Sequence, residues 1–593
     1  MEAEIKGQKL FTARLGIGLA QGLALYLLYS AHDAKVWPAT QGLVFVPLVL
    51  VWVFIPALLI QALGEMPWRK AVAWAGVALL VIALLAFFDN WSAWPWDWSY
   101  GPKPVATPHV TPSPQLIFAG GAGLFIAHAL IVGANIDHRV MAKYPTHFDV
   151  AWKMAVQLAL SAAFVGAFWL LLWLGASLFA LIKLDFFRKL IGHEWFAIPV
   201  TTLAASGALH LTDIRPALVR GARTLALTLL SWLLPLIALI VTGFLVSLPF
   251  TGLTPLWSFG HASALLLTAA AALIILINAA YQDGDTERLP PRILRLSGSI
   301  AAALPLPLSA IAAYALYLRV TQYGWTVGRI WLAASVLLAC SYAIGYVYAT
   351  AMRGRWLSRI ERWNFFVSLE TLAVLVALFT PIASPARIAV ADQVRRLNSG
   401  KIPASKFDFQ FLRWEGGRYG QAALVALSAS NNDFTRKMAS GALRKNNRYT
   451  ALDAPVSLEG HLTVYPQGQK LPQSFAQMTW KDDSGVRTMP RCSAKVSCDA
   501  ILADLDGDGH SEVLIIGDQS LFVQVFRERA DHIWTQEGTF QLPFNCPAAL
   551  SRLREGHFEM RPPPYRFNDI QVGSVLFHVQ DVFDVRQAPK CPT

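Results

Sequence analysis

The sequence contains few charged residues. Lys, Arg, Asp and Glu make up 15% of its 593 residues, and hydrophobic residues make up 55%. A soluble chain carries about 25% charged residues, so this composition excludes a wholly soluble protein. The scarcity is uneven, because 41 of the first 382 residues are charged, whereas 47 of the last 211 are. We therefore expect residues 1–382 to lie in a membrane and the remainder to fold as a soluble domain.

Cysteine is also scarce. Five are present, without a CxxC pair, which disfavours a structural zinc site. Cys340 lies in an apolar segment, and the other four lie in the last 211 residues. An even set outside the membrane is typical of two disulfides in an oxidising compartment. Of three possible pairings we favour Cys492–Cys498, a short local loop, with Cys546–Cys591; four free thiols in a cytoplasmic domain are the alternative.

Eleven apolar segments are long enough to cross about 30 Å of hydrocarbon, which takes roughly 20 residues. They lie at about 13–30, 42–63, 71–88, 115–136, 153–182, 196–211, 222–248, 262–280, 297–318, 330–350 and 364–382. Several contain proline, but no matching pair of interrupted helices occurs in two halves, so the indication of a transporter is weak. The expected fold class is a polytopic all-α membrane domain followed by a soluble α+β extracytoplasmic domain.

Positive charge marks one side of this arrangement. With the N-terminus in the cytoplasm, the segments on that side hold 17 Lys and Arg residues and those on the other side hold 7, as expected when basic loops stay in the cytoplasm. The loop at 183–189 is an exception. An odd number of spans puts the C-terminal domain outside, and the first span, without a clean cleavage site, is expected to remain as an anchor. The net charge of +12 is thus largely a topology signal and indicates no nucleic acid partner.

The last 211 residues divide into two parts. A polar helical stalk is predicted at 383–402 and a small helical region at about 418–445, which together make a segment at 383–450. From 451 to 593, short strands separated by turn signals predict a β-rich α+β domain.

An acidic loop at 504–512 is the strongest chemical motif. Carboxylates at positions 1, 3, 5 and 9, with Gly509 at position 6 and a backbone carbonyl at position 7, form an oxygen cage that suits calcium. The candidate ligands are Asp504, Asp506, Asp508, His510 and Glu512. Because a strand follows directly and Ile515 replaces the twelfth-position acid of an EF-hand, the loop resembles the calcium loops of integrin-type FG-GAP blades. A turn whose acids face water is the alternative. The expected role of calcium is structural, and no organic cofactor is indicated.

Ionisable residues inside apolar segments are functional candidates, because their burial in a membrane is costly. Glu370 is the clearest, followed by His128 and Asp137. Glu370 is a candidate proton or cation site in a transporter; its alternative is a buried hydrogen bond between helices or an ion pair with a nearby arginine. His128 is more often a packing residue than a relay.

The stretch at 89–100 is dense in Trp and Tyr. An aromatic belt at the membrane interface is its ordinary explanation. A platform for sugar rings or lipid headgroups, with Asp89 or Asp97 as its acid, is the alternative. Membrane glycosyltransferases that use polyprenyl-phosphate sugars keep a catalytic acid in such an outer loop.

Two stretches resemble a bacterial family. The turn at 314–329 (YALYLRVTQYGWTVGR) and the segment at 407–420 (FDFQFLRWEGGRYG) are similar to signatures of domain-of-unknown-function family 4153. The resemblance implies a multi-pass protein of the bacterial inner membrane, and it brings no established activity or catalytic residue. Tyr323, Trp325 and Arg329 are expected at the outer headgroup boundary, where they either anchor the chain to lipid or bind an anionic lipid-linked substrate.

These features favour an inner-membrane protein with a calcium-binding periplasmic domain, serving cell-envelope maintenance or transport of an envelope component without enzymatic turnover. A membrane transferase acting on lipid-linked substrates at the periplasmic face is one alternative. A sensor or scaffold that presents its periplasmic domain to a protein partner is another. The expected partners are membrane lipids and a lipid-linked or envelope substrate.

Overall fold

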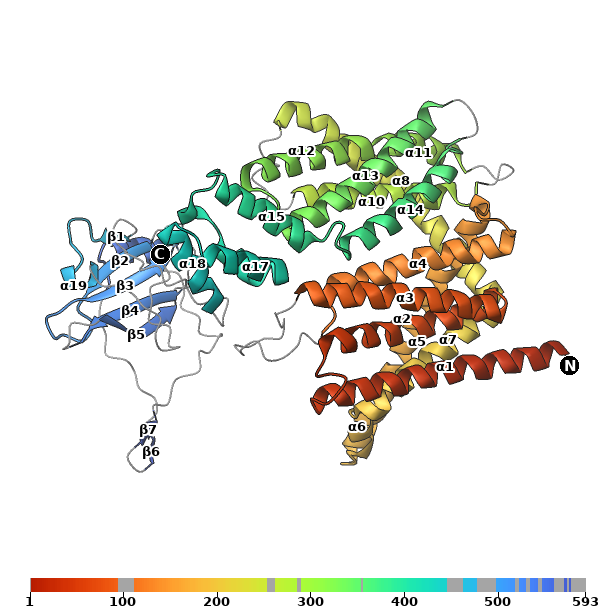
Figure 1. Cartoon of the computed structure of the whole chain (residues 1–593), viewed down its shortest axis with the longest axis horizontal. Helices are drawn as coiled ribbons and strands as arrows, with labels where there is room; N and C mark the ends of the chain where they lie inside the picture. The colour runs from red at the N-terminus through yellow and green to blue at the C-terminus, as the bar shows by residue number, and fades with distance from the viewer. Residues whose placement is uncertain are drawn as a thin grey trace. The chain divides into compact units, whose positions relative to one another are not determined.

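The chain folds into two compact units, residues 1–446 and 447–593. The computed structural model describes residues 2–93, 111–252, 262–284, 290–352, 356–444, 462–476, 498–517, 522–529, 534–541, 547–558, 570–572 and 575–577. The first unit is helical, and the second contains a small mixed sheet (Figure 1). A helical region followed by a mixed α and β region agrees with the fold class expected from composition.

Nine helical segments among the described residues are long and apolar enough to cross a membrane. They are α1 (Glu2–Asp33), α2 (Gly42–Glu65), α3 (Trp68–Ala93), α4 (Pro114–Asp137), α5 (Tyr144–Leu181), α8 (Pro216–Thr251), α10 (Ala262–Tyr281), the consecutive pair α11 (Arg292–Ala303) and α12 (Pro305–Tyr323), and α13 (Val327–Ala351). Large apolar side chains also point away from the bundle, since Leu170 is 72% and Phe250 85% exposed. Helices that are apolar both inward and outward suit a lipid environment.

The predicted count of eleven spans is not confirmed. The sixth and eleventh predicted spans are helices, α7 (Glu194–Ile214) and α14 (Ile360–Leu378), but neither joins the nine apolar segments in the described chain. Polar residues explain this: α7 includes His210 and Asp213, and α14 carries three charged side chains. Both helices nevertheless pack in the bundle, α7 against α1 and α5, and α14 against α4 and α13. The short α6 (Phe186–Ile191) lies between α5 and α7 in the sequence.

A large apolar core of the first unit lies among α8, α10, α11, α12 and α13. Small side chains fill its centre, where Ala270, Ala301 and Ala312 are completely buried. Because lipid tails are as apolar as leucine, close packing through small residues is what holds such helices together. Tyr346 on α13 is also completely buried, and its hydroxyl therefore requires a hydrogen-bond partner inside the bundle.

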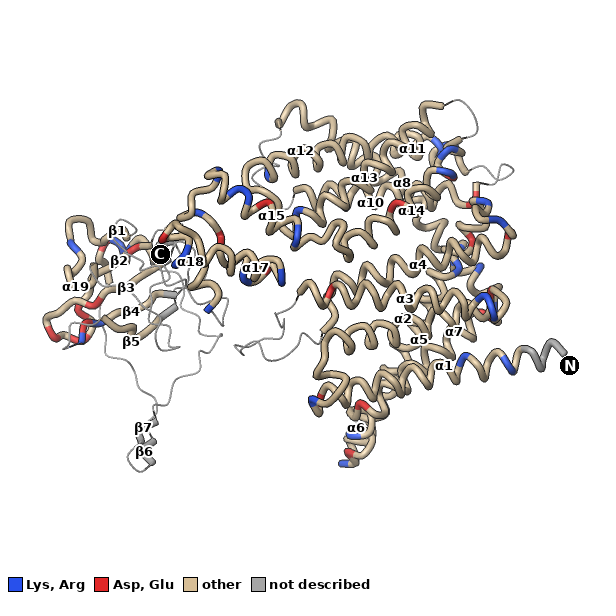
Figure 2. The backbone as a smooth tube through the Cα atoms, viewed as in Figure 1, with Lys and Arg blue, Asp and Glu red and all other residues tan. Residues whose placement is uncertain are grey.

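Many Lys and Arg residues of the first unit gather at the end of the membrane helices where the N-terminus lies (Figure 2). They include Arg69 and Lys70 at the start of α3 and Arg292 and Arg295 at the start of α11. This segregation is the pattern of a membrane face retained in the cytoplasm.

Short helices follow α14 and belong to the first unit. They are α15 (Pro385–Asn398), the 3-10 turn η1 (Ala404–Lys406), α16 (Phe409–Trp414), α17 (Gly417–Ser428) and α18 (Asp433–Arg444). Within this unit α15 packs against α13, and α17 packs against α3. The segment predicted as a stalk and helical region is therefore docked on the membrane helices.

The second unit is built on a five-stranded sheet in the order β1-β2-β3-β4-β5. Its strands are β1 (Leu462–Tyr465), β2 (Cys498–Ala503), β3 (Glu512–Gly517), β4 (Phe522–Glu528) and β5 (Trp534–Gln541). Strands β1 and β2 are parallel, and the other neighbours are antiparallel. The remaining elements are α19 (Gln473–Ala476), α20 (Pro547–Arg554) and the separate pair β6 (Ile570–Val572) and β7 (Val575–Phe577).

Apolar side chains cover both faces of this sheet. On one face Phe475 of α19 packs with Phe526 and Trp534, and on the other Ile501 and Leu514 pack with α20. Alternate residues of a strand point to opposite faces, so the continuous apolar run in β3 can serve both cores. This two-sided burial holds β2 and β3 rigidly on either side of the acidic loop.

Candidate functional site

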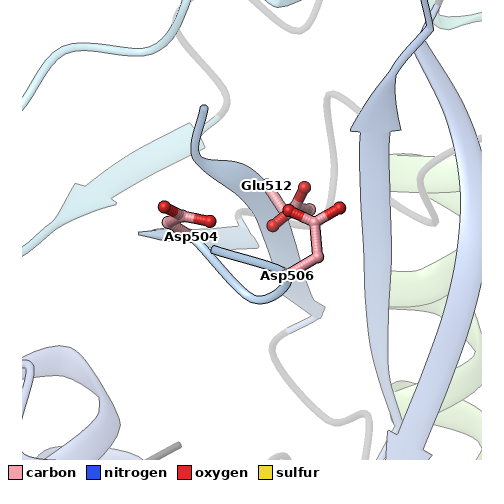
Figure 3. A group of neighbouring side chains, drawn as sticks. All are labelled: Asp504, Asp506 and Glu512. Atoms are coloured by element: carbon pink, nitrogen blue, oxygen red, sulfur yellow. The ribbon is translucent and has the colours of Figure 1, made fainter. Parts of the chain in front are cut away.

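The acidic loop is the connection between two antiparallel strands. Strand β2 ends at Ala503, which pairs with Glu512, the first residue of β3. Gly507 and Gly509 have φ of +76° and +84°, left-handed values that favour glycine at both positions. The chain turns at these glycines, and the acidic side chains lie at the rim of the hairpin (Figure 3).

Three of the predicted ligands lie together. Oxygens of Asp504, Asp506 and Glu512 are all within 4.8 Å of one another. Two oxygens bound to one calcium ion at about 2.4 Å are at most about 5 Å apart, so the three carboxylates fit a single ion. Glu512 is buried, whereas Asp506 is exposed. The group is thus open to solvent on one side and supported from beneath on the other.

Backbone N–H groups orient two of these carboxylates. Asp504 accepts from Gly507 N at 2.7 Å and from Gly509 N at 3.0 Å, and Glu512 Oε2 accepts from Leu505 N at 2.7 Å. A carboxylate has about four lone-pair sites, so these bonds leave capacity for a cation. The loop therefore holds its acids in place by its own main chain.

Asp508 lies outside the group of three. Its Oδ1 accepts from His510 N at 2.8 Å and its Oδ2 from Arg527 at 3.0 Å. The backbone N–H of His510 and then the Arg527 guanidinium hold the pKa of Asp508 below its usual range. His510 is exposed.

Arg527, on β4, is the residue that sequence reasoning missed in this site. Its Nη2 lies 2.5 Å from Asp506 Oδ2 and 3.0 Å from Asp508 Oδ2, and its Nε lies 3.7 Å from Glu512 Oε1. These carboxylates raise the pKa of Arg527. Arginine on a strand is usually a solvated surface residue, and only the pairing of β3 with β4 reveals this contact.

The predicted disulfides lie largely outside the described residues, which include neither Cys492 nor Cys546 nor Cys591. Cys498 is buried at the start of β2, and the pairing remains a prediction. Cys340, on α13, is a free thiol.

The ionisable candidates of the membrane helices have hydrogen-bond partners. Glu370 accepts from Ser341 Oγ of α13 at 2.8 Å, which matches the alternative of a bond between helices. His128 Nδ1 accepts from Trp74 Nε1 at 2.9 Å. Asp137 accepts from Lys143 N at 2.7 Å and from Thr146 Oγ1, closing the connection between α4 and α5.

The aromatic stretch is only partly described. Asp89 lies near the end of α3, half-buried beside Ser113. Asp97 falls outside the described residues. The structure therefore brings no second acid to Asp89 among the residues that it describes.

The turn between α12 and α13 is held by α15. Asp392 accepts from Trp325 N at 2.9 Å, and Gln393 Nε2 donates to the carbonyls of Tyr323 and Trp325 at 2.9 Å. Arg329 donates to Gly324 O at 2.5 Å and stacks over the Tyr323 ring. The family signature at 314–329 thus includes a docking site for the helix that leaves the membrane.

The second family segment packs through glycine. A side chain at Gly420 would overlap the Leu412 carbonyl, and one at Gly417 (φ +53°) would overlap the Ser92 carbonyl of α3. The Arg418 guanidinium lies 3.9 Å from the centre of the Trp91 ring. Close backbone approach therefore explains these glycines.

A buried ion network joins four membrane helices, and sequence reasoning did not identify it. Arg14 Nη2 lies 2.9 Å from Asp213 Oδ2, and Lys153 lies 3.2 Å from Asp213 Oδ1 and also contacts Glu65. The Arg14 side chain is 2% exposed. Glu65 and Asp213 lie at the ends of α2 and α7, whereas Arg14 and Lys153 lie within α1 and α5, and the sequence alone does not show that the four side chains meet.

Apolar helices with a buried ion network at one end define a multi-pass membrane protein. The chain belongs to the family described as a domain of unknown function, DUF4153, whose model matches residues 22–427. The resemblance of the two sequence stretches is thereby confirmed. Comparisons with curated proteins and with solved structures find no match. The acidic loop lies beyond the matched residues.

Proposed function

We propose that this chain is an eleven-span protein of the bacterial inner membrane, with its N-terminus in the cytoplasm and a calcium-binding domain in the periplasm. Support for two further spans comes from α7 and α14, which pack among the apolar helices and find partners there for their polar side chains. Support for the orientation comes from the Lys and Arg residues at one end of the bundle (Figure 2).

The grouping of Asp504, Asp506 and Glu512 carries the calcium proposal. Hard cations take carboxylate and carbonyl oxygens at 2.3–2.6 Å, and calcium tolerates irregular geometry. The 4.8 Å span of the three oxygen atoms suits such an ion, and the exposed rim leaves room for backbone carbonyls and water to complete the shell. The residues present therefore fit calcium better than zinc, which favours nitrogen and sulfur ligands.

Calcium has a structural role in this proposal. The loop concentrates four carboxylates, and Arg527 contacts three of them. A divalent ion neutralises two charges where a guanidinium neutralises one, so it stabilises the hairpin more than Arg527 does alone. The ion would fasten the β2–β3 connection to the sheet.

At the cellular level the protein serves envelope maintenance or transport of an envelope component. Most of the chain lies in the helical membrane unit, and an open cavity of about 670 Å³ lies among its helices, a volume within the range of small-ligand sites. The loop, as a structural metal site, performs no turnover.

Calcium titration of the full chain in lipid nanodiscs tests the metal site. We expect calorimetry to give one calcium ion per chain, and the melting temperature of the C-terminal unit to be higher in calcium than in EGTA. Asp504→Asn and Asp506→Asn should abolish both effects. Glu555→Gln is the matched control, because this exposed acid of the same unit lies outside the loop. No binding heat and equal melting in calcium and EGTA would overturn the proposal.

Labelling of single cysteines in spheroplasts tests the orientation. Lys401→Cys should react with a membrane-impermeant maleimide from outside, whereas Arg69→Cys should react only after the membrane is permeabilised. Both residues are exposed, so a difference reports the side of the membrane. The reverse pattern would contradict the proposed topology.

A further inference from the structure

A cavity in the membrane unit lies among α4, α5, α10, α13 and α14. Its volume is about 670 Å³, within the range of sites that hold small molecules. Aromatic side chains make much of its wall, among them Phe125, Phe148, Trp152 and Phe365. A cavity of this size among membrane helices has room for a hydrocarbon chain.

Three cations line the same cavity. Arg139 and Lys143 come from the connection between α4 and α5, and Arg362 comes from the first turn of α14. All three side chains are exposed, and none forms an ion pair with another described residue. Other basic residues of the bundle differ, since Arg223 is paired with Asp149. These three cations are therefore available to an anion from outside the protein.

One carboxylate accompanies the three cations. Glu361 is the acid among the lining residues, and its Oε1 accepts from Tyr281 Oη at 2.6 Å. The formal charge of the lining is thus +2 with histidine neutral. Such a balance attracts a phosphate, and arginine matches its oxygens with two parallel hydrogen bonds.

Two polar side chains of the wall, Asn278 and Asn364, are hydrogen bonded to each other and to the buried Tyr346 behind them. Asn278 Nδ2 donates to Tyr346 Oη at 2.6 Å, Tyr346 Oη donates to Asn364 Oδ1 at 3.0 Å, and Asn364 Nδ2 donates to Asn278 Oδ1 at 2.7 Å. Tyr144 Oη donates to Asn278 Oδ1 at 3.4 Å. This ring joins α5, α10, α13 and α14 without a formal charge, so the wall does not require a second ionic group on the ligand.

We propose that this cavity binds a phosphate ester carried on a hydrocarbon chain. The phosphate lies at Arg139, Lys143 and Arg362, and the chain lies against the aromatic wall. Retention of basic loops in the cytoplasm explains why basic residues gather at this end of the bundle. It does not explain why three cations that pair with no described acid line one ligand-sized cavity. The site is separate from the calcium loop and does not depend on it.

Binding of a fluorescent short-chain phosphatidic acid to the full chain in detergent micelles tests this proposal. We expect Arg362→Gln to weaken binding at least tenfold, since it removes a charge-assisted hydrogen bond to the phosphate. Arg292→Gln is the matched control, because Arg292 is an exposed arginine of the same unit that does not line the cavity. The affinity of Arg292→Gln for phosphatidic acid should stay within twofold of that of the wild type.

Competitors separate the two parts of the ligand. Diacylglycerol of the same chain length lacks the phosphate, and inorganic phosphate lacks the chain, so both should compete at least tenfold more weakly than unlabelled phosphatidic acid. Equal competition by diacylglycerol would overturn the role of the cations. Equal competition by inorganic phosphate would overturn the role of the chain and leave a site for free anions.

A cavity-filling variant tests the wall independently. Ala151 lines the cavity on α5, and Ala151→Phe should weaken phosphatidic acid binding at least fivefold. Its melting temperature reports whether the bundle still folds. A folded Ala151→Phe protein that binds phosphatidic acid as the wild type does would overturn the proposed location of the ligand. Equal losses of affinity in Arg362→Gln and Arg292→Gln would overturn it as well.

Discussion

The guanidinium of Arg527 lies 3.0 Å from the carboxylate of Asp508, across from the loop that joins β2 and β3. The same guanidinium contacts Asp506 and Glu512. A strand residue thus supplies positive charge to the loop in the absence of a metal ion. Calcium bound as proposed would compete with Arg527 for the same carboxylates, and this competition can be measured.

Replacement of Arg527 by Gln should increase the calcium affinity of the full chain. Because the guanidinium is exposed and its attraction to the carboxylates is screened by water, we expect an increase of only about fivefold. In EGTA the same variant should melt at a lower temperature, because its acids repel one another. Calorimetry measures the first effect and tryptophan fluorescence the second. Arg529→Gln is the control, since Arg529 pairs with Glu537 outside the loop; a fall in affinity in Arg527→Gln would refute competition.

Acid should weaken the calcium-free loop through Asp508. Its pKa is below the usual range, because the His510 N–H and Arg527 favour the ionised form. The resulting stabilisation is complete above the ordinary pKa of about 4 and is lost as the pH falls through the lower folded value. In EGTA, the melting temperature of the wild type should therefore fall more between pH 5 and pH 3 than that of Asp508→Asn. Parallel curves for the two proteins would contradict this linkage.

Gly420→Ala should destabilise the first unit. A methyl group there would overlap the Leu412 carbonyl, which is main chain and cannot rotate away. Overpacking of this kind costs about 1–3 kcal/mol. Gly441→Ala in α18 is the matched control, because a methyl group there has no atom within 4 Å and alanine favours helix. Urea unfolding of the full chain in detergent compares them, and equal stability of the two variants would reject the packing explanation.

Asp213→Asn should be among the most destabilising changes of the membrane helices. It would leave Arg14 and Lys153 without the carboxylate that both contact, and removing one partner of a buried pair costs about 3–5 kcal/mol. Asp149→Asn should cost less than about 1 kcal/mol, because Asp149 is 53% exposed in its pair with Arg223. Urea unfolding of the full chain in detergent compares the two variants. Similar losses of unfolding free energy would show that the network is no stronger than a surface ion pair.

Much of the fold could be predicted from local features of the chain. Long apolar runs mark helices, and short runs rich in β-branched and aromatic residues, such as β3 and β4, mark strands. Two predicted spans, at α7 and α14, were ambiguous because polar side chains interrupt them. The partners of these polar side chains, Arg14 for Asp213 and Ser341 for Glu370, come from other helices. A hydropathy average over one segment contains no information about such partners.

The proximity of three acids in the loop could be predicted, because Asp504, Asp506 and Glu512 lie within nine residues of the sequence. Asp504 and Asp506 come together with Glu512 through one hairpin. The exception is Asp508, which turns instead to Arg527. This contact depends on β4, the strand that carries Arg527, follows the loop in the sequence and pairs with β3.

The sequence by itself determined the division into a membrane part and a mixed α and β part, the family of the first part and the acidic loop of the second. Composition, hydropathy and spacing are local properties of the chain, so they can be obtained from the sequence without knowledge of the fold. Only the tertiary structure decided that Arg527 faces the loop, that Arg14 pairs with Asp213, and that Arg139 and Arg362 line one cavity. These residues are distant along the chain, and packing of helices and strands alone brings their side chains within reach.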